Sequence, residues 1–312
     1  MTTTLVTGGG GFIGSNLVHA LLARGHAVRV LDNFATGREE NLTEVRDRIA
    51  LHRADLRDAA AVARAVEGCD FVLHEAALPS VVHSVSDPVL THDVNLNGTL
   101  TLLEAARAAR VKRLVFAGSS AVYGNSEVLP KVETMPPEPL SPYALHKIAA
   151  ETYGRLYTSL YGLEVVTLRY FNVFGPRQDP KSDYAAVIPR FVAMMSQGQA
   201  PTIFGDGGQT RDFCHIDNVI EANVLACTAP SAPGRTYNVA CGERISLLDL
   251  VDRINGILGT SVVAAHAPER VGDVRHSVAD IAAAQRDLGY VGGVNFTEGL
   301  RRTIAWYLGG SR

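Results

Sequence analysis

The sequence has few cysteines and no excess of charge of either sign. Its four cysteines, Cys69, Cys214, Cys227 and Cys241, form no C-x-x-C pair, which argues against a zinc knuckle or a dithiol redox motif. We therefore expect reduced thiols in a reducing compartment. Lys and Arg together number 29, and Asp and Glu 32, for a formal net charge of −3. Nothing in this balance favours nucleic acid or an anionic membrane as a partner.

Long apolar runs are also missing. No stretch approaches the roughly 18 uninterrupted apolar residues of a membrane span, and the first residues lack the basic and apolar regions of a signal peptide. We expect a cytoplasmic protein with no membrane partner. The chain has 312 residues, of which 46% are hydrophobic and 20% charged. These values are typical of a globular protein with one large or two modest domains.

Short β-rich runs alternate with helical runs through the first half of the chain. Strands are expected at 5–7, 27–31, 49–52, 71–73, 113–117 and 164–170, and helices at 15–24, 59–66, 90–109 and 142–161. This alternation predicts an α/β fold of Rossmann type, with a doubly wound parallel sheet. Beyond Asn172, shorter elements rich in Pro and Gly predict a smaller, mixed α/β domain. The expected boundaries are 1–171, joined by returning segments near 212–240, and 172–312.

A glycine-rich turn follows the first expected strand. Gly8, Gly11 and Gly14 are spaced G-x-x-G-x-x-G, which permits a tight turn and close approach of the backbone to a pyrophosphate. The following helix N-terminus offers unpaired N–H groups to the phosphates. Asp32 ends the second strand, where a carboxylate suits the ribose hydroxyls of NAD and repels the 2′-phosphate of NADP. Asp55 ends the third strand, where it would face the adenine. The pattern predicts NAD as cofactor.

A tyrosine and a lysine share one face of the helix expected at 142–161. Ser141 is a good N-cap and Pro142 suits the first helical position. Tyr143 then lies in the first turn and Lys147 one turn later. An unperturbed tyrosine pKa of about 10 is too high for a base at neutral pH. The ammonium, a positive nicotinamide ring and the helix N-terminus all favour the phenolate, so we expect a pKa for Tyr143 near ~7.

Two serines, Ser119 and Ser120, follow the strand expected at 113–117. The carboxyl ends of strands in an open parallel sheet face the ligand crevice. A hydroxyl at this edge would bond the reacting oxygen and relay its proton. We therefore expect Ser119, with Ser120 as the fallback, to act together with Tyr143 and Lys147.

These motifs, together with residues 95–99 (Asn-Leu-Asn-Gly-Thr) and 169–172 (Arg-Tyr-Phe-Asn), resemble the extended short-chain dehydrogenase/reductase family over essentially the whole chain. Within it they resemble the UDP-hexose 4-epimerases. The resemblance implies inversion of the C4 hydroxyl of UDP-glucose and UDP-galactose, and of their N-acetylated counterparts, through a transient 4-keto intermediate. NAD is the implied cofactor and a UDP-sugar the implied substrate. Ser119, Tyr143 and Lys147 are the implied catalytic residues.

The resemblance also implies two sets of binding residues. Those for the cofactor are Gly8, Gly11, Phe12, Ile13, Gly14, Asp32, Asn33, Asp55, Leu56, Ala76, Asn95, Tyr143, Lys147 and Tyr170. Those for the substrate are Ser119, Ser120, Tyr143, Asn172, Val187, Phe204, Arg211, Arg270, Asp273 and Ser277.

Each substrate-side position has an implied task. Asn172, Arg211 and Arg270 match contacts to the diphosphate and its ribose, and the planar guanidinium suits phosphate. Asp273 matches a contact to a ribose hydroxyl, and Val187 and Phe204 match the lining of the uracil pocket. Ser277 falls where a tyrosine would restrict the pocket to glucose and galactose. A small residue there admits an N-acetyl group without creating a preference for it.

Particular residues bear on whether the chain has a related activity. The dehydratases and decarboxylases of the family carry a carboxylate after the catalytic serine, whereas this chain has Ser120-Ala121, which lacks the acid and base for elimination. The H-E-x-x-H zinc pattern fails at Leu78, so no metal is predicted. UDP-glucuronate 4-epimerisation, with Arg177 as the extra cation, and another nucleotide-sugar epimerase stay open. So does a non-catalytic NAD sensor.

The resemblance further implies a homodimer. The helices expected at 90–109 and 142–161 would pair with those of a second copy in a four-helix bundle. Two residues depart from the family pattern. His83 stands where relatives often have arginine, and His146 stands in an unusual place between Tyr143 and Lys147.

Overall fold

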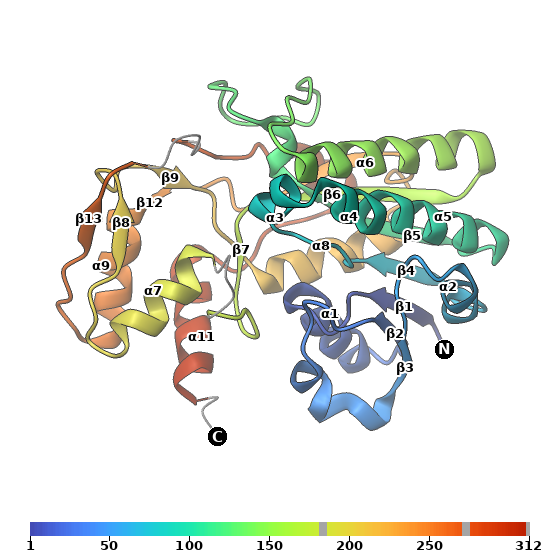
Figure 1. The fold of residues 1–312 in the computed structure, drawn as a ribbon, viewed down its shortest axis with the longest axis horizontal. Coiled ribbons are helices and arrows are strands. Elements are labelled where there is room, and N and C mark those ends of the chain that lie inside the picture. The colour runs from blue at the N-terminus through green and yellow to red at the C-terminus, as the bar shows by residue number, and fades with distance from the viewer. Residues whose placement is uncertain (181–185, 270–274, 310–312) are drawn as a thin grey trace.

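A seven-stranded parallel sheet forms the centre of the molecule, which confirms the Rossmann-type α/β prediction (Figure 1). The computed structural model describes residues 1–180, 186–269 and 275–309. The strand order is β11-β6-β5-β4-β1-β2-β3, with parallel pairing throughout. The strands are β1 (Thr3–Thr7), β2 (Ala27–Asp32), β3 (Ile49–Arg53), β4 (Phe71–His74), β5 (Arg113–Ser119), β6 (Glu164–Tyr170) and β11 (Thr236–Val239).

Helices cover both faces of this sheet and bury its alternating apolar side chains in two cores. On one face α1 (Phe12–Ala23), α8 (Ile216–Thr228) and α10 (Ala282–Leu288) pack against residues such as Val6 and Val30. On the other, α2 (Ala59–Val66), α5 (Gly98–Ala108) and α6 (Pro142–Tyr161) pack against residues such as Leu5 and Val72. Continuous apolar strands of this kind are typical of a sheet that is buried on both faces.

Two helices differ from the sequence prediction. The first begins at Phe12 rather than at residue 15, because Gly11 already serves as its N-cap. The long helix expected at 90–109 consists of α4 (Pro88–His92), a π-helical turn η2 (Asp93–Asn97) and α5. In the wide turn the buried Asn95 accepts a hydrogen bond from the backbone N–H of Leu78 at 2.7 Å and donates to its carbonyl at 3.1 Å. The helix is thus interrupted by a π-helical turn at the point where the Asn95 side chain satisfies the backbone N–H and carbonyl groups of Leu78.

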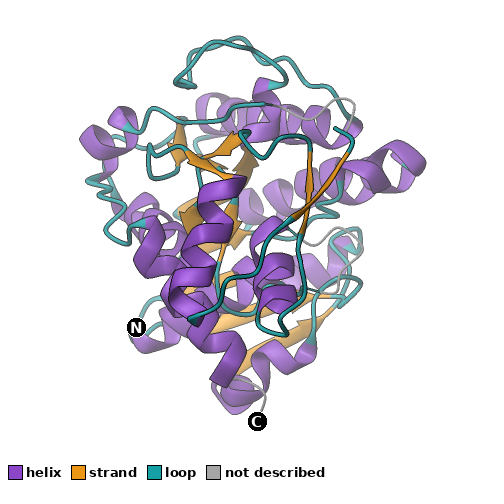
Figure 2. Ribbon diagram, turned by 90° about the vertical axis from the view of Figure 1, so that its left-hand side faces the viewer, coloured by secondary structure: helices purple, strands orange, loops and turns teal. Residues whose placement is uncertain are grey.

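The second part of the chain forms a smaller group of elements beside the sheet, onto which Figure 2 looks. Its own core contains Phe174, Phe191, Ile203, Phe213 and Phe296. Its elements are β7 (Val173–Phe174), α7 (Val187–Met195), β8 (Thr202–Phe204), β9 (Thr210–Arg211), β10 (Cys214–His215), β12 (Ile245–Ser246), α9 (Leu247–Leu258), β13 (Ala265–Ala267) and α11 (Phe296–Gly309).

Shorter helices complete the structure. They are η1 (Glu39–Arg48), α3 (Val81–Ser86) and η3 (Ser120–Tyr123). Across the described ranges, no helix combines the length and apolar character needed to cross a membrane.

A buried ion pair between Arg169 and Glu151 joins β6 to α6. The Arg169 guanidinium donates to both carboxylate oxygens of Glu151, at 2.9 and 2.7 Å, and both side chains are almost fully buried. Arg169 also donates to the hydroxyl of Tyr123 at 2.8 Å. A buried charge of this kind is tolerated only while its partner remains.

Glu151→Gln should therefore lower the free energy of unfolding by about 3–5 kcal/mol, because it leaves a buried guanidinium without its counter-charge. Urea unfolding followed by circular dichroism measures the effect. Glu269→Gln is the matched control, since it breaks an exposed pair with Arg275 and should leave the unfolding midpoint close to that of the wild type. Equal midpoints for the two variants would contradict the importance of the buried pair.

Candidate active site

Four neighbouring strands end together at one edge of the sheet. In register, Thr7 of β1 lies beside His74 of β4, and His74 lies beside Phe116 of β5. Ser119, which ends β5, pairs with Tyr170, which ends β6. The glycine turn after β1, the residue after β4 and the serine of β5 therefore share one edge, as expected for the ligand crevice of an open parallel sheet.

The glycine turn is shaped for close contact between backbones. A Cβ atom at Gly14 would lie 2.1 Å from the carbonyl oxygen of Gly8, and one at Gly8 would lie 2.7 Å from the backbone of Ala76. Gly11, the N-cap of α1, makes no side-chain capping hydrogen bond. Phe12 and Ile13 form the first turn of this helix, whose N–H groups suit an anion. The turn thus fits the pyrophosphate of a dinucleotide.

Asp32, at the end of β2, is hydrogen-bonded to the backbone of this turn. Its carboxylate accepts hydrogen bonds from the backbone N–H groups of Gly10 at 2.8 Å and Phe34 at 2.7 Å. Burial raises the pKa of Asp32, and the two hydrogen bonds oppose that shift. Asp32 therefore holds the glycine turn in place from the end of β2, and its role at a ribose stays a prediction.

Other cofactor-side positions follow β2 and β3 at the same edge of the sheet. Asn33 donates to Asp55 at 2.8 Å. Asp55 also pairs with Arg57, which lowers the pKa of Asp55 to about 2. Leu56 is buried close to Gly98, where an added Cβ would lie 2.9 Å from the Leu56 side chain. The carboxylate expected at the adenine is thus an ionised partner of an arginine.

The structure brings Ser119, Tyr143 and Lys147 together. Ser141 caps α6 by accepting from the N–H of Ala144 at 3.2 Å, so Tyr143 falls in the first turn as predicted. Lys147 donates to the carbonyl of Ala117 on β5 at 2.7 Å. Its ammonium lies 5.8 Å from the centre of the Tyr143 ring. The side chain of Ser119 lies close enough to the Tyr143 hydroxyl to lower the pKa of Tyr143. Ser120 is the next residue and begins η3.

The expected low pKa of Tyr143 is not produced by the groups of this chain. Burial raises its pKa above the ordinary value, the charge of Glu75 adds to the rise, and the hydrogen bond with Ser119 opposes it. Lys147 is itself affected, because burial lowers its pKa to about 8. The helix terminus, the ammonium and a positive nicotinamide ring are expected to favour the phenolate, whereas burial of the hydroxyl acts in the opposite direction.

Glu75 is a site residue that the sequence argument missed. It accepts a hydrogen bond from the Tyr170 hydroxyl at 2.9 Å, and Tyr170 accepts one from Asn223 at 2.8 Å. Burial raises the pKa of Glu75 to about 7. Its position directly after β4, at the same edge as Ser119, is a signal that was available in the sequence.

The substrate-side residues lie along the segment that follows β6. Asn172 donates to the carbonyl of Asp212 at 3.3 Å. The carboxylate of Asp212 accepts from three backbone N–H groups, those of Cys241, Gly242 and Ala279, at 2.9–3.1 Å. This buried carboxylate fixes the position of its neighbour Arg211.

The remaining substrate-side positions are spread over several elements. Arg211 donates to the carbonyls of Thr210 at 2.9 Å and Arg275 at 3.3 Å, and the N–H of Ser277 donates to the Thr210 carbonyl at 3.1 Å. Val187 begins α7 and Phe204 ends β8. Arg270 and Asp273 lie outside the described residues.

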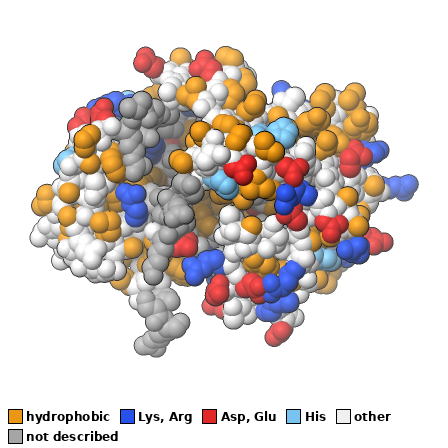
Figure 3. Space-filling model, viewed as in Figure 1, with side chains coloured by type: hydrophobic (Ala, Val, Ile, Leu, Met, Phe, Trp, Pro, Cys, Tyr) orange, Lys and Arg blue, Asp and Glu red, His pale blue; other side chains and the backbone are white. Residues whose placement is uncertain are grey.

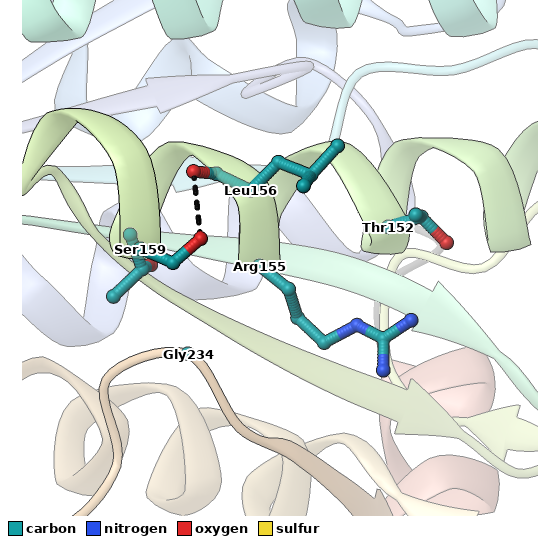
Figure 4. A pocket seen from close by; sticks show the side chains of 6 residues that line it. Thr152, Arg155, Leu156, Ser159 and Gly234 are labelled. Atoms are coloured by element: carbon teal, nitrogen blue, oxygen red, sulfur yellow. Dashed lines mark hydrogen bonds between the residues drawn. The ribbon is translucent and has the colours of Figure 1, made fainter.

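A surface hollow elsewhere is distinct from this site (Figure 4). It lies between α6 and the loop that carries Gly234 (Figure 4), where Ser159 donates to the carbonyl of Leu156 at 3.2 Å. None of the predicted site residues lines it. The lining residues are Thr152, Arg155, Leu156, Thr158, Ser159 and Gly234.

Comparison with known proteins gives consistent matches. The family model described as "NAD dependent epimerase/dehydratase family" matches residues 4–240. The UDP-glucose 4-epimerase of Mycolicibacterium smegmatis is 40% identical over 308 residues, with 97% of this chain and 98% of the relative covered.

Two solved structures are similar over 99% of both chains. One is the UDP-N-acetylglucosamine 4-epimerase of Methanobrevibacter ruminantium in complex with UDP-N-acetylmuramic acid, with a TM-score of 0.94 and 37% identity. The other is the UDP-glucose 4-epimerase of Thermus thermophilus in complex with NAD, with a TM-score of 0.89 and 41% identity. The family predicted from the sequence motifs is thereby confirmed.

Gly14→Ala should remove most of the NAD that purifies with the protein, because the new methyl group forces the turn open against Gly8. Nucleotide released by acid and resolved by chromatography measures the loss. Gly256→Ala, in α9, meets no atom within 4 Å and is the matched control. If Gly14→Ala kept its full nucleotide content, the turn would not be the phosphate site.

Proposed function

The chain belongs to the NAD dependent epimerase/dehydratase family, and we propose that it inverts the C4 hydroxyl of UDP-hexoses. The observation that carries this proposal is the grouping of Ser119, Tyr143 and Lys147 beside a turn that fits a dinucleotide. The residues that follow Ser119 are Ser120 and Ala121, so the carboxylate needed for elimination is missing at that point. The arrangement suits oxidation and reduction at one carbon with no net redox change.

Each residue has a task that follows from its position. Bound NAD supplies a hydride acceptor and donor for C4, and its positive ring favours the Tyr143 phenolate. Tyr143 takes the proton of the 4-hydroxyl and returns it later. Ser119 bonds the same oxygen and orients it. Lys147, tied to the end of β5, places a positive charge near the phenolate and stabilises it.

The binding groups around the site are expected to hold the two ends of each ligand. The turn from Gly8 to Gly14 and Asp32 hold the dinucleotide. Asn172 and Arg211, with Arg270, hold the diphosphate of the substrate. The sugar is then free to turn about its link to the diphosphate, so that a 4-keto intermediate presents either face to the hydride.

Tyr143→Phe should lower turnover by about 10²–10⁴-fold, because it removes the group that exchanges the C4 hydroxyl proton. Purified protein is incubated separately with UDP-glucose, UDP-N-acetylglucosamine and UDP-glucuronate without added NAD, and the 4-epimers are resolved by chromatography. Conversion of the first two is expected. Conversion of UDP-glucuronate alone would replace the substrate and keep the mechanism. No conversion even with NAD supplied, or unchanged turnover in Tyr143→Phe, would contradict the proposal.

Ser277 supports a pocket that admits N-acetylated sugars. Its backbone is held by Thr210, so its small side chain occupies a fixed position. Ser277→Tyr should keep activity on UDP-glucose and lose at least about tenfold of kcat/KM on UDP-N-acetylglucosamine, because the ring fills the space of the acetamido group. The ratio of the two kcat/KM values measures this. A parallel loss on both substrates would show that Ser277 does not select the sugar.

A homodimer through α6 and its neighbours is also proposed. Exposed hydrophobic side chains on α6 include Leu145, Tyr153, Leu156, Leu160 and Tyr161. Figure 3 shows that hydrophobic side chains gather on the face that carries α3 and α6. Apolar side chains grouped on a helix surface are typical of a protein interface.

The double change Leu156→Glu with Leu160→Glu should convert the dimer to a monomer, because it buries two charges in the proposed interface. Sedimentation velocity measures the state. Val263→Glu changes another exposed apolar residue, in the second part of the chain, and should leave the dimer intact. A wild-type monomer, or a dimer that survives the double change, would contradict the interface.

A cytoplasmic location is proposed on the state of the cysteines. Cys69, Cys214, Cys227 and Cys241 are all free thiols. Free thiols are typical of reducing compartments.

A further inference from the structure

Glu75 is an acidic side chain in the middle of the site that the reaction described above does not use. It follows β4 directly, and β4 lies between β1 and β5 in the sheet. Its backbone N–H donates to the carbonyl of Thr7 at 3.3 Å. The position of Glu75 is therefore set by the sheet itself, between the phosphate turn and Ser119.

The carboxylate is oriented by a chain of hydrogen bonds from two further elements. The Tyr170 hydroxyl, at the end of β6, donates to Oε1 of Glu75 at 2.9 Å. Asn223 of α8 donates to the Tyr170 oxygen at 2.8 Å and to the carbonyl of Val219 at 2.8 Å. A side chain supported in this way is held in one orientation.

Three titratable groups face Glu75. They are Tyr143 and Lys147 on α6 and Tyr170 on β6. Lys147 Nζ lies 4.9 Å from the ring centre of Phe116, which is the neighbour of His74 in the sheet, and 5.8 Å from that of Tyr143. The adjacent His74 is uncharged, because burial lowers its pKa to about 3. Burial raises the pKa of Glu75 to about 7, so above that pH Glu75 is the anionic member of a group that also contains one cation and two phenols.

One carboxylate has opposite effects on the two catalytic side chains. Lys147 is buried against a neutral carbonyl, and the charge of Glu75 raises the pKa of this lysine. The same charge raises the pKa of Tyr143. A negative charge in a poorly solvated site favours an ammonium and disfavours a phenolate.

We propose that Glu75 is a positioning residue of this enzyme, whose carboxylate keeps Lys147 charged and sets the pH at which Tyr143 becomes a base. The part that concerns turnover rests on the proposed epimerase function. The electrostatic part concerns residues of this chain alone.

Glu75→Gln separates charge from hydrogen bonding, because the amide keeps an oxygen that accepts from Tyr170. Loss of the negative charge lowers the pKa of Tyr143 and that of Lys147. With NAD bound, whose positive ring favours the phenolate, the acid limb of kcat/KM follows ionisation of Tyr143, and the alkaline limb follows loss of the Lys147 proton. The alkaline limb should move to lower pH by about one unit, because Glu75 is ionised where Lys147 titrates. The acid limb should move the same way to the extent that it lies above the pKa of Glu75. A merely structural residue would lower the rate at every pH without moving the limbs.

Tyrosinate absorbance gives a second readout that needs no substrate. The Tyr143 component is the difference between each protein and the same protein with Tyr143→Phe. It should titrate at lower pH in Glu75→Gln than in the wild type. Glu75→Asp keeps the charge and should titrate near the wild type. Glu67→Gln removes an exposed carboxylate at the end of α2 and should change neither readout.

The outcomes are separable. A shift in Glu75→Gln that Glu75→Asp does not show supports the proposal. The proposal is overturned if Glu75→Gln changes neither the pH profile of kcat/KM nor the pH at which Tyr143 titrates. It is also overturned if Glu75→Asp shifts them as much as Glu75→Gln does. If the protein converts no UDP-sugar, the proposed function fails, and the absorbance titration still decides the electrostatic role of Glu75.

Discussion

All seven strands of the central sheet run in one direction, so the residue that follows each strand lies at the same edge. The phosphate turn, Glu75 and the segment that begins at Phe171 are placed by this single constraint. Helix α6 contributes Tyr143 and Lys147 to this edge. The hydrogen bond from Lys147 to the carbonyl of Ala117 holds the helix against the end of β5. Chemistry that needs several groups around one carbon atom becomes possible because the parallel sheet brings these groups together.

Burial in that edge has an electrostatic consequence. Tyr143, Lys147 and Glu75 are all buried away from water, and burial disfavours the charged form of each side chain. The three groups therefore determine one another's ionisation. The positive ring of a bound nicotinamide fits such a site, since it favours the phenolate that burial disfavours. In the proposed mechanism, binding of the cofactor and activation of Tyr143 as the base are therefore linked.

Much of the fold and site was predictable because local patterns specify it. The spacing of Gly8, Gly11 and Gly14 and the spacing of Tyr143 and Lys147 are both set within a few residues. The π-helical turn at Asn95 depends on a loop after β4 that is remote in sequence. The pKa of Tyr143 depends on burial by the whole fold, which raises it in the protein alone and which no local pattern reveals. Glu75 shows the same limit, since its partners Tyr170 and Asn223 are distant in the sequence.

The central claim is that hydrogen leaves C4 of a UDP-hexose and returns to the same carbon on the other face. The most direct test uses UDP-glucose labelled with deuterium at C4, in ordinary water and without added NAD. The product is examined by NMR and mass spectrometry. The mechanism predicts UDP-galactose that retains the deuterium at C4. Loss of the label to solvent would contradict hydride return within a closed site, and an unchanged substrate would contradict the epimerase itself.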